Sequence, residues 1–325
     1  MGRLTFVCFL LLAVAEFAAC EVAVHSRIVG GEDAKLGAYP WQASVWYANS
    51  HACGATVISP SWVLSAAHCF PSDHVWTDYI IKAGALQLGT YEASVQSSAI
   101  ADVKINPLYT HDSSSAADLA LIALKTPFSF NEFVQAIFLP SANVQFPAGM
   151  KCKVTGWGDI RRGAPLPQPL HMQVGNVVLI SRNTCNCLYN IKPLKPPMTI
   201  EQDMICAGTV QGSVDACQGD SGGPLSCLAN GKWFLGGVVS WGKECGLENN
   251  PGVYIKPNAH AGWIQSTVPA VKMEDVTIDI PPVQENENGC IGADGVFYPN
   301  GASIYLLTFA TLPLYWLTAY LLTYC

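Results

Sequence analysis

Short apolar runs separated by turn-forming residues recur from residue 28 to residue 268 and restrict the folds open to this chain. The runs are rich in β-branched and aromatic side chains and are interrupted by Gly, Pro, Asn and Ser. Examples are residues 41–46, 56–59, 62–65, 79–83, 119–124, 153–156 and 235–241. This spacing is typical of the strands of an all-β barrel or sandwich. A helical pattern is convincing only near residues 259–268.

The charge balance argues against a nucleic-acid partner. The 325 residues include 17 Lys and Arg against 24 Asp and Glu, a formal net charge of −7, and the longest basic run is the pair Arg161-Arg162. Phosphate binding needs clustered basic side chains, which are missing here.

Half of the residues are hydrophobic, which excludes disorder for most of the chain, and the length allows about two domains of ~150 residues each.

Thirteen cysteines indicate either an oxidising compartment or a metal protein. No Cys-x-x-Cys pair with matching His or Cys partners supports a zinc site, so we expect no metal.

The N-terminus favours the secretory route, because Arg3 is followed by an apolar run and by small residues. We assign residues 1–15 to a signal peptide, with cleavage as late as Cys20 also open, and residues 16–27 to a propeptide. The alternative is a buried N-terminal helix.

The other end of the chain predicts a membrane anchor. Residues 304–325 are almost continuously apolar, long enough to cross a bilayer, and no Lys or Arg follows them. A terminal apolar tail behind small residues and a polar spacer is the signal for a glycosylphosphatidylinositol (GPI) anchor, after which the tail is removed. Asn288 and Gly292 begin candidate attachment triplets. The alternative is a retained transmembrane tail.

An acidic stretch separates this tail from the rest. Residues 28–269 carry 14 basic and 16 acidic side chains, whereas residues 270–294 carry one basic and six acidic ones. We therefore predict that residues 270–303 form a solvated stalk and spacer that joins a near-neutral globular domain to the membrane.

Two tracts carry the chemistry, Ser65-Ala66-Ala67-His68-Cys69 and Gly219-Asp220-Ser221-Gly222-Gly223-Pro224. A serine hydroxyl is a weak nucleophile, so Ser221 needs an imidazole such as His68 to take its proton. A carboxylate must hold that imidazole in one tautomer, and Asp118 is the candidate. Gly219 allows a backbone turn that directs its own N–H and that of Ser221 at one point, an oxyanion hole.

In their order along the chain, His68, Asp118 and Ser221 resemble the triad of the chymotrypsin-family (trypsin-like) serine proteases. The resemblance extends over about residues 28–269. It implies two six-stranded antiparallel β-barrels with a C-terminal helix, a serine endopeptidase, and no metal or organic cofactor. The rival interpretation is a non-catalytic binding protein on the same fold, but such members have generally lost a triad residue, and this chain keeps all three.

The same resemblance assigns a specificity pocket. Asp215, six residues before Ser221, matches the carboxylate that selects Arg or Lys at the cleaved bond. Its neighbour is Ala216, where a serine hydroxyl would help to bind lysine. Since arginine makes its own bidentate contact with a carboxylate, we predict Arg over Lys. The matching pocket walls contain Ser240, Trp241, Gly242 and Gly252.

Activation is implied by Arg27-Ile28-Val29-Gly30-Gly31. In the family, cleavage between the residues matching Arg27 and Ile28 frees an ammonium, which is buried beside the carboxylate matching Asp220. Because a buried unpaired charge is costly, this pairing orders the oxyanion loop. The uncut chain is then a poorly active zymogen.

The cysteine pattern implies four disulfides, Cys53–Cys69, Cys152–Cys227, Cys185–Cys206 and Cys217–Cys245, and leaves Cys187 over. Together with Ala216 and the membrane tail, the tract around Cys187 resembles the prostasin-like, channel-activating members of the family. These carry a cysteine where this chain has Phe138. The propeptide cysteine Cys20 therefore lacks its usual partner. Either the propeptide dissociates, or Cys20 pairs with Cys187 or Cys290.

The resemblance to prostasin-like proteases implies an enzyme on the outer face of the plasma membrane. Its substrates would be extracellular or membrane proteins with Arg or Lys at the cleaved bond, such as epithelial sodium channel subunits. Serpin or Kunitz-type inhibitors would be its other protein partners.

Overall fold

The computed structural model describes residues 30–300, apart from residues 113, 161–162, 193–196, 282, 284–285 and 287. The predictions for the signal peptide, the propeptide, the Arg27–Ile28 bond and the tail 304–325 fall outside the described residues. No helix in the described ranges is long and apolar enough to span a bilayer.

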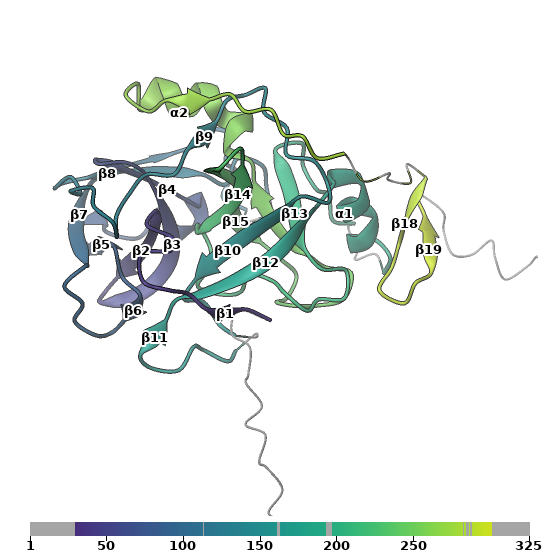
Figure 1. The fold of residues 1–325 in the computed structure, drawn as a ribbon, viewed down its shortest axis with the longest axis horizontal. Helices are drawn as coiled ribbons and strands as arrows, with labels where there is room; N and C mark the ends of the chain where they lie inside the picture. The colour runs from purple at the N-terminus through teal and green to yellow at the C-terminus, as the bar shows by residue number, and fades with distance from the viewer. Residues whose placement is uncertain are drawn as a thin grey trace, which may run out of the picture.

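The first half of the chain closes into a six-stranded antiparallel barrel (Figure 1). Its strands, in their order around the barrel, are β2 (Gln42–Tyr47), β3 (Ser50–Ser59), β4 (Trp62–Ser65), β8 (Ala120–Leu124), β7 (Gln96–Ile105) and β5 (Tyr79–Ala83). Alternate apolar side chains fill its interior; Ala43, Val45, Val57, Val63 and Ile81 are fully buried there. The alternation seen in the sequence therefore has the period of two expected for strands with one face in a core.

The second half forms a second barrel of the same type. Six strands lie in the order β12 (Gln173–Ile180), β10 (Lys151–Gly156), β14 (Pro224–Ala229), β15 (Lys232–Trp241), β16 (Gly252–Ile255) and β13 (Met204–Gly208), and a β12–β13 pairing closes the ring. The short strand β1 (Glu32–Asp33) adds to the edge of β12. The prediction of two six-stranded antiparallel barrels is confirmed.

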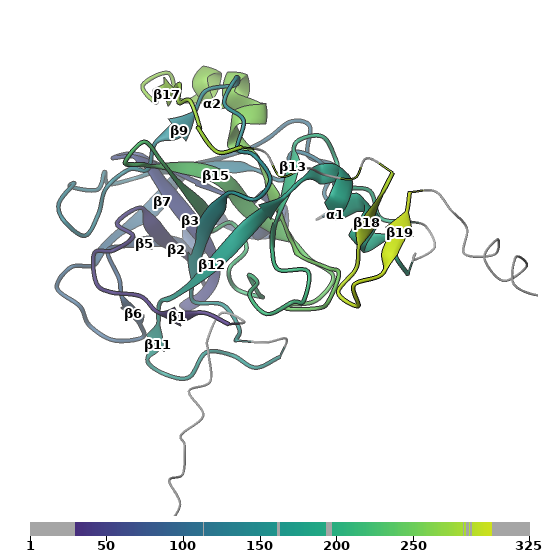
Figure 2. The same cartoon turned by 45° about the vertical axis from the view of Figure 1, so that its right-hand side comes forward.

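The two barrels pack side by side through a shared apolar core (Figures 1 and 2). Leu64 and Leu121 of the first barrel lie in one buried cluster with Val253 and Ile255 of the second. A buried hydrogen bond also joins the two halves, since the Trp41 indole N–H donates to Ser226 Oγ at 2.9 Å. A site built from both halves therefore rests on a fixed junction.

Two α-helices accompany the barrels in the described part of the chain. Helix α2 (Ala261–Thr267), preceded by the 3₁₀ turn η3 (Pro257–His260), lies where the sequence pattern predicts a helix. Helix α1 (Arg182–Tyr189) was not predicted. Its N-terminus is capped by Ser181, whose hydroxyl accepts from the Thr184 N–H at 3.1 Å. A Ser cap of this kind is the local signal that could have revealed the helix.

The segment after α2 is packed against the domain over its described part, which differs from the predicted solvated stalk. Strand β17 (Met273–Glu274) pairs in parallel with β9 (Leu139–Pro140), and Val276 and Ile278 pack on the second barrel's core. A hairpin follows, made of β18 (Gly289–Ile291) and β19 (Phe297–Pro299). Figure 2 shows this hairpin beside α1, to which the Cys187–Cys290 disulfide ties it.

The remaining short elements lie in loops. The two-stranded pairing of β6 (Gln87–Leu88) with β11 (Leu170–His171) bridges loops of the two halves. The 3₁₀ turns η1 (Ala67–Cys69) and η2 (Trp76–Asp78) follow β4.

Candidate active site

The junction of the barrels brings His68 and Asp118 together. His68 lies in η1, just after β4, and Asp118 stands just before β8; β4 and β8 pair directly, with Ser65 opposite Ala120. His68 Nδ1 lies 2.7 Å from Asp118 Oδ2, and the His68 backbone N–H donates to Oδ1 at 2.9 Å. Because a carboxylate only accepts, Nδ1 carries the proton, and Nε2 of the neutral ring is left as a base.

Asp118 has a third donor that the sequence analysis assigned only to the pocket wall. The Ser240 hydroxyl, on β15, donates to Asp118 Oδ2 at 2.5 Å. The side chain of Asp118 is fully buried, and both of its oxygens accept hydrogen bonds. The carboxylate is therefore held in one orientation by both barrels.

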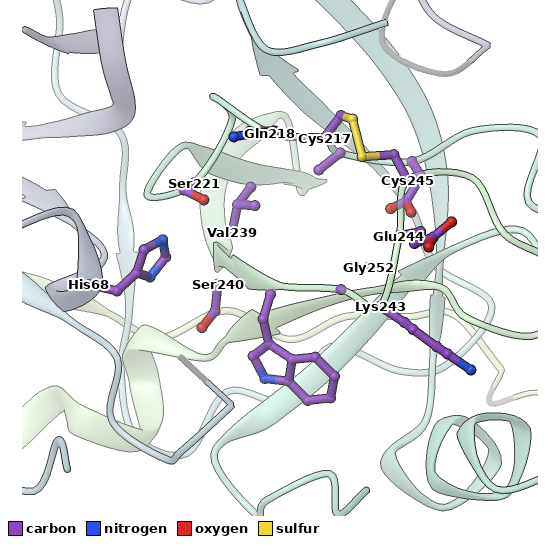
Figure 3. A pocket seen from close by; sticks show the side chains of 14 residues that line it. His68, Cys217, Gln218, Ser221, Val239, Ser240, Lys243, Glu244, Cys245 and Gly252 are labelled. Carbon is purple, nitrogen blue, oxygen red and sulfur yellow. A yellow bond between two sulfur atoms is a disulfide. The ribbon is translucent and has the colours of Figure 1, made fainter. Parts of the chain in front are cut away.

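Ser221 lies opposite this pair. His68 and Ser221 line the same cavity, which has a volume of about 350 Å³. Figure 3 shows the His68 imidazole and the Ser221 side chain at the same end of it. Two of the three residues predicted as a triad thus line one cavity, and the third, Asp118, contacts His68.

The backbone at Gly219, one of the two residues predicted to form an oxyanion hole, has a left-handed conformation. Its φ of +97° lies in the region that favours glycine. Among the described residues, neither the Gly219 N–H nor the Ser221 N–H donates to a protein acceptor. Both N–H groups are therefore left for a ligand.

His51 fixes this loop, and the sequence analysis did not identify it. Its Nε2 lies 3.0 Å from the Gly219 carbonyl, and its Nδ1 lies 2.7 Å from Ser44 Oγ. Burial lowers the pKa of His51 to about 4, against a weaker raising effect of the Gly219 carbonyl. The neutral ring therefore donates from Nε2 and accepts from the Ser44 hydroxyl at Nδ1. The only signal in the sequence is its place two residues before Cys53.

Asp215, predicted to select the substrate side chain, is buried and lines the same cavity. Its side chain is 3% exposed, Oδ2 accepts from the Gly246 N–H at 3.1 Å, and Oδ1 has no partner among the described residues. Burial raises the pKa of Asp215 to about 7, although backbone N–H groups beside it act in the opposite direction. A buried carboxylate with a free oxygen favours a cation as ligand.

The predicted walls surround this carboxylate. The cavity is lined by Ala216, Ser240, Trp241, Gly242 and Gly252, and the Cys217–Cys245 disulfide crosses its rim (Figure 3). A Cβ on Gly252 would lie 2.6 Å from Asp215 Oδ1, so a glycine is required there. Lys243 and Glu244 also line the cavity and were not predicted.

Asp220 is the third buried carboxylate of the region. It is fully buried, and its two oxygens accept from the N–H groups of Gly158 and Cys217, both at 2.9 Å. Burial raises the pKa of Asp220 to about 6 against the effect of these donors. No ion pair joins it to a cation within the part of the chain that the structure describes.

All four disulfides implied by the resemblance are present, namely Cys53–Cys69, Cys152–Cys227, Cys185–Cys206 and Cys217–Cys245. The fifth, Cys187–Cys290, corrects the view of Cys187 as unpaired and leaves neither of its cysteines for Cys20. One group of potential metal ligands occurs among the described residues, Cys53, His68 and Cys69, and its two sulfur atoms are bonded to each other.

Comparison with known proteins places this geometry in context. A family model described as trypsin matches residues 28–264. Human testisin is 39% identical over 249 residues, which cover 74% of this chain and 78% of testisin. Human serine protease 41 is 36% identical over 252 residues, 74% of this chain and 76% of that protein. Rat transmembrane protease serine 9 is 37% identical over 256 residues, 78% of this chain but 23% of the rat protein.

Proposed function

Since the chain belongs to the trypsin family and is a serine endopeptidase, we propose that it cleaves protein substrates after arginine, and less readily after lysine, through Ser221, His68 and Asp118. One observation carries this proposal. A buried carboxylate with an unpaired oxygen, Asp215, lines the same cavity as His68 and Ser221. A basic side chain of the substrate would thereby bind in the same site as the nucleophile Ser221.

The first step is proton transfer. His68 Nε2 takes the Ser221 hydroxyl proton as Oγ attacks the scissile carbonyl carbon. The resulting imidazolium is stabilised by Asp118, whose Oδ2 already lies 2.7 Å from Nδ1. His68 then gives the proton to the leaving amine. In the second half of the reaction, His68 takes a proton from water as the water attacks the acyl carbon, and it returns that proton to Ser221 Oγ as the acyl group leaves.

The developing oxyanion is bound by the N–H groups of Gly219 and Ser221. Donors fixed before the reaction stabilise charge without reorganising, which is the main source of catalysis in such sites. His51 contributes indirectly, because its bond to the Gly219 carbonyl holds the peptide plane next to the hole.

Preference for arginine follows from the chemistry around Asp215. A guanidinium can donate two parallel bonds to a carboxylate, whereas an ammonium depends more on additional acceptors. Ala216 offers no hydroxyl for that purpose. The pocket therefore discriminates in favour of arginine.

The chain is made as a zymogen that is cut between Arg27 and Ile28. The fully buried carboxylate of Asp220, with its raised pKa, is the group that a new Ile28 ammonium would neutralise. Such a pairing removes the cost of burying a lone charge. The propeptide dissociates after cleavage, because Cys187 and Cys290 are bonded to each other.

The mature enzyme is held on the outer face of the plasma membrane by a GPI anchor. Attachment at Asn288 would remove Cys290 and its disulfide, whereas attachment at Gly292 keeps β18 and Cys290 and removes the chain from residue 293 onward, including β19. Gly292 is therefore the preferred site. Release by phosphatidylinositol-specific phospholipase C, followed by mass spectrometry of the C-terminal peptide, separates these sites from each other and from a transmembrane tail.

Within the family, the likeness to prostasin suggests epithelial sodium channel subunits among the substrates, and serpin or Kunitz-type inhibitors as regulators. The tract around Cys187, Ala216 and the apolar tail support this assignment. Co-expression of the channel with wild type or Ser221→Ala tests it, because only the active enzyme should produce cleaved subunits.

Cleavage of matched Arg, Lys and Phe fluorogenic peptides by protein cut at Arg27–Ile28, with Ser221→Ala alongside, tests the proposed activity. We expect hydrolysis in the order Arg, Lys, Phe, and none by the variant. A correctly cut wild type that hydrolyses no peptide would favour the binding-protein alternative.

A further inference from the structure

A second Asp–His pair lies behind the first. His260 Nε2 stands 2.8 Å from Asp203 Oδ2, and both side chains are about nine-tenths buried. Both residues belong to the second half of the chain: Asp203 directly precedes β13, and His260 ends η3. The pair lies outside the cavity that holds Ser221.

This pair reaches across the junction to both chain neighbours of Asp118. Asp203 Oδ2 accepts from the Ala117 backbone N–H at 2.7 Å. On the other side, His260 Nδ1 lies 3.1 Å from Asn106 Nδ2, and the Asn106 backbone N–H donates to the Leu119 carbonyl at 2.9 Å. The residues on either side of Asp118 are therefore both linked to the Asp203–His260 pair, Ala117 directly and Leu119 through Asn106.

The first of these contacts holds a backbone that would otherwise relax. Ala117 is fully buried and has a φ of +60°, a left-handed conformation that a residue with a Cβ rarely adopts. A short bond from the Leu119 N–H to the Ala117 carbonyl, 2.7 Å, closes the turn around Asp118. A strained conformation of this kind persists only where the surrounding structure fixes it.

The charges are consistent with this arrangement. The Asn106 amide donates to Nδ1 of His260, so Nε2 carries the proton and donates to Asp203. Burial acts to raise the pKa of Asp203, but the hydrogen bonds from His260 and Ala117 outweigh it and keep the pKa below its usual value. Asp203 is thus an ionised acceptor shared by a ring N–H and a backbone N–H.

We propose that Asp203 and His260 form a latch between the barrels that positions Asp118 by holding Ala117 in its left-handed turn. Asp203 is the primary positioning residue, and His260 orients Asp203. This inference rests on the proposed function, because the latch acts on kcat only if Asp118 orients His68 during catalysis.

The test uses the full chain cut at Arg27–Ile28, with active sites counted by covalent labelling of Ser221. Asp203→Ala should lower kcat per labelled site on the Arg peptide at least about tenfold and leave KM within about twofold. Asp203→Asn keeps an oxygen acceptor of the same shape and should retain kcat within about threefold. Asp102→Ala removes an exposed aspartate that pairs with Lys104 and is the matched control, with no change expected.

A double variant separates positioning from general stability. Glycine adopts positive φ without a steric penalty, so Ala117→Gly should restore part of the kcat lost in Asp203→Ala. A merely structural latch would lower the melting temperature of Asp203→Ala and leave kcat per labelled site unchanged, which would overturn the proposal. His260→Ala, which leaves the Asp203–Ala117 bond in place, covers the case in which Asp203→Ala fails to fold. It should lower kcat about threefold, and an unchanged kcat would count against the latch.

The wild type in the same series keeps the two proposals apart. An inactive wild type contradicts the proposed function, and the catalytic role of the latch with it. An active wild type with an unimpaired Asp203→Ala contradicts the latch alone.

Discussion

Asp118 and Asp215 are both buried carboxylates close to one cavity, yet they differ in how many hydrogen bonds the protein donates to them. Asp118, at the barrel junction, accepts hydrogen bonds from the His68 backbone, the His68 ring and the Ser240 hydroxyl. Asp215, within the second barrel, accepts one bond from Gly246 and has an oxygen without a partner among the described residues. Burial raises the pKa of Asp215 to about 7.

Under the proposed function, this difference separates catalysis from recognition. A catalytic carboxylate must already be oriented when the transition state forms, so its partners are built into the fold. A recognition carboxylate must keep part of its binding capacity for the substrate, and the fold tolerates the cost of its burial. Substitutions can alter the hydrogen bonding of either carboxylate, and the predictions below run from the largest expected effect to the smallest.

Asp118→Asn should have the largest effect. The amide cannot accept from Nδ1 while also meeting the His68 backbone donor, so it favours the wrong ring tautomer. We expect kcat on an Arg peptide to fall about 10⁴-fold, the loss typical of this change in the family's triad, with KM little altered. Steady-state kinetics on site-labelled protein measure this, and a loss below tenfold would remove Asp118 from its assigned role.

Asp215→Asn should come next and should act on recognition. Removing one charge of a buried pair costs about 2–5 kcal/mol, so kcat/KM for the Arg peptide should drop by about 30-fold to several thousand-fold. Labelling of Ser221 by a small uncharged phosphonate should be unchanged, because the triad is untouched. Retained preference for Arg would show that another group selects the substrate.

Ser240→Ala should have a smaller effect. It removes one hydrogen bond to a charged acceptor, worth about 1.5–3 kcal/mol, and should lower kcat by about 10- to 100-fold. Ser226→Ala is the matched control, because Ser226 is an equally buried serine of the second barrel that bonds Trp41 instead. It should lower the melting temperature without lowering kcat, and equal kcat losses in both variants would contradict the assignment.

The double change Cys187→Ser with Cys290→Ser should affect stability alone. Opening this cross-link, which spans a sequence separation of 103, should reduce the free energy of unfolding by about 2–4 kcal/mol. Urea unfolding measures the loss. Peptide hydrolysis at 25 °C should match wild type, and a fall in kcat/KM would instead connect the hairpin to the active site.

The candidate site residues could be named from the sequence because they lie in short tracts with strict chemical requirements. His68 and Ser221 were assigned from such tracts, Asp215 from the resemblance to the trypsin-like proteases, and the barrels from short apolar runs such as residues 79–83. The contacts that support the cleft could not be found in this way. His51, Asp203 and His260 act through atoms brought near by the fold, over separations in sequence of 57 to 168 residues.

The acidic segment after α2 was misinterpreted for a related reason. Its charge and its two prolines predicted a free stalk, but a few apolar residues and one cysteine are enough to fix it on the domain. Val276 and Ile278 pack on the second barrel, and Cys290 finds Cys187. The acidic composition describes the segment as a whole, whereas its packing depends on a few individual residues such as Val276, Ile278 and Cys290.

The central claim, that the protein leaves Asp215 to be completed by a cationic substrate, is tested most directly by the binding of benzamidine between pH 5 and pH 8. A raised folded-state pKa of about 7 means that Asp215 must lose a proton before it pairs with the amidinium. Affinity measured by calorimetry should rise about tenfold per pH unit up to pH 7 and then level off. Asp215→Asn should bind weakly, with no such rise. An affinity that does not change with pH, or equal binding by the variant, would contradict the account.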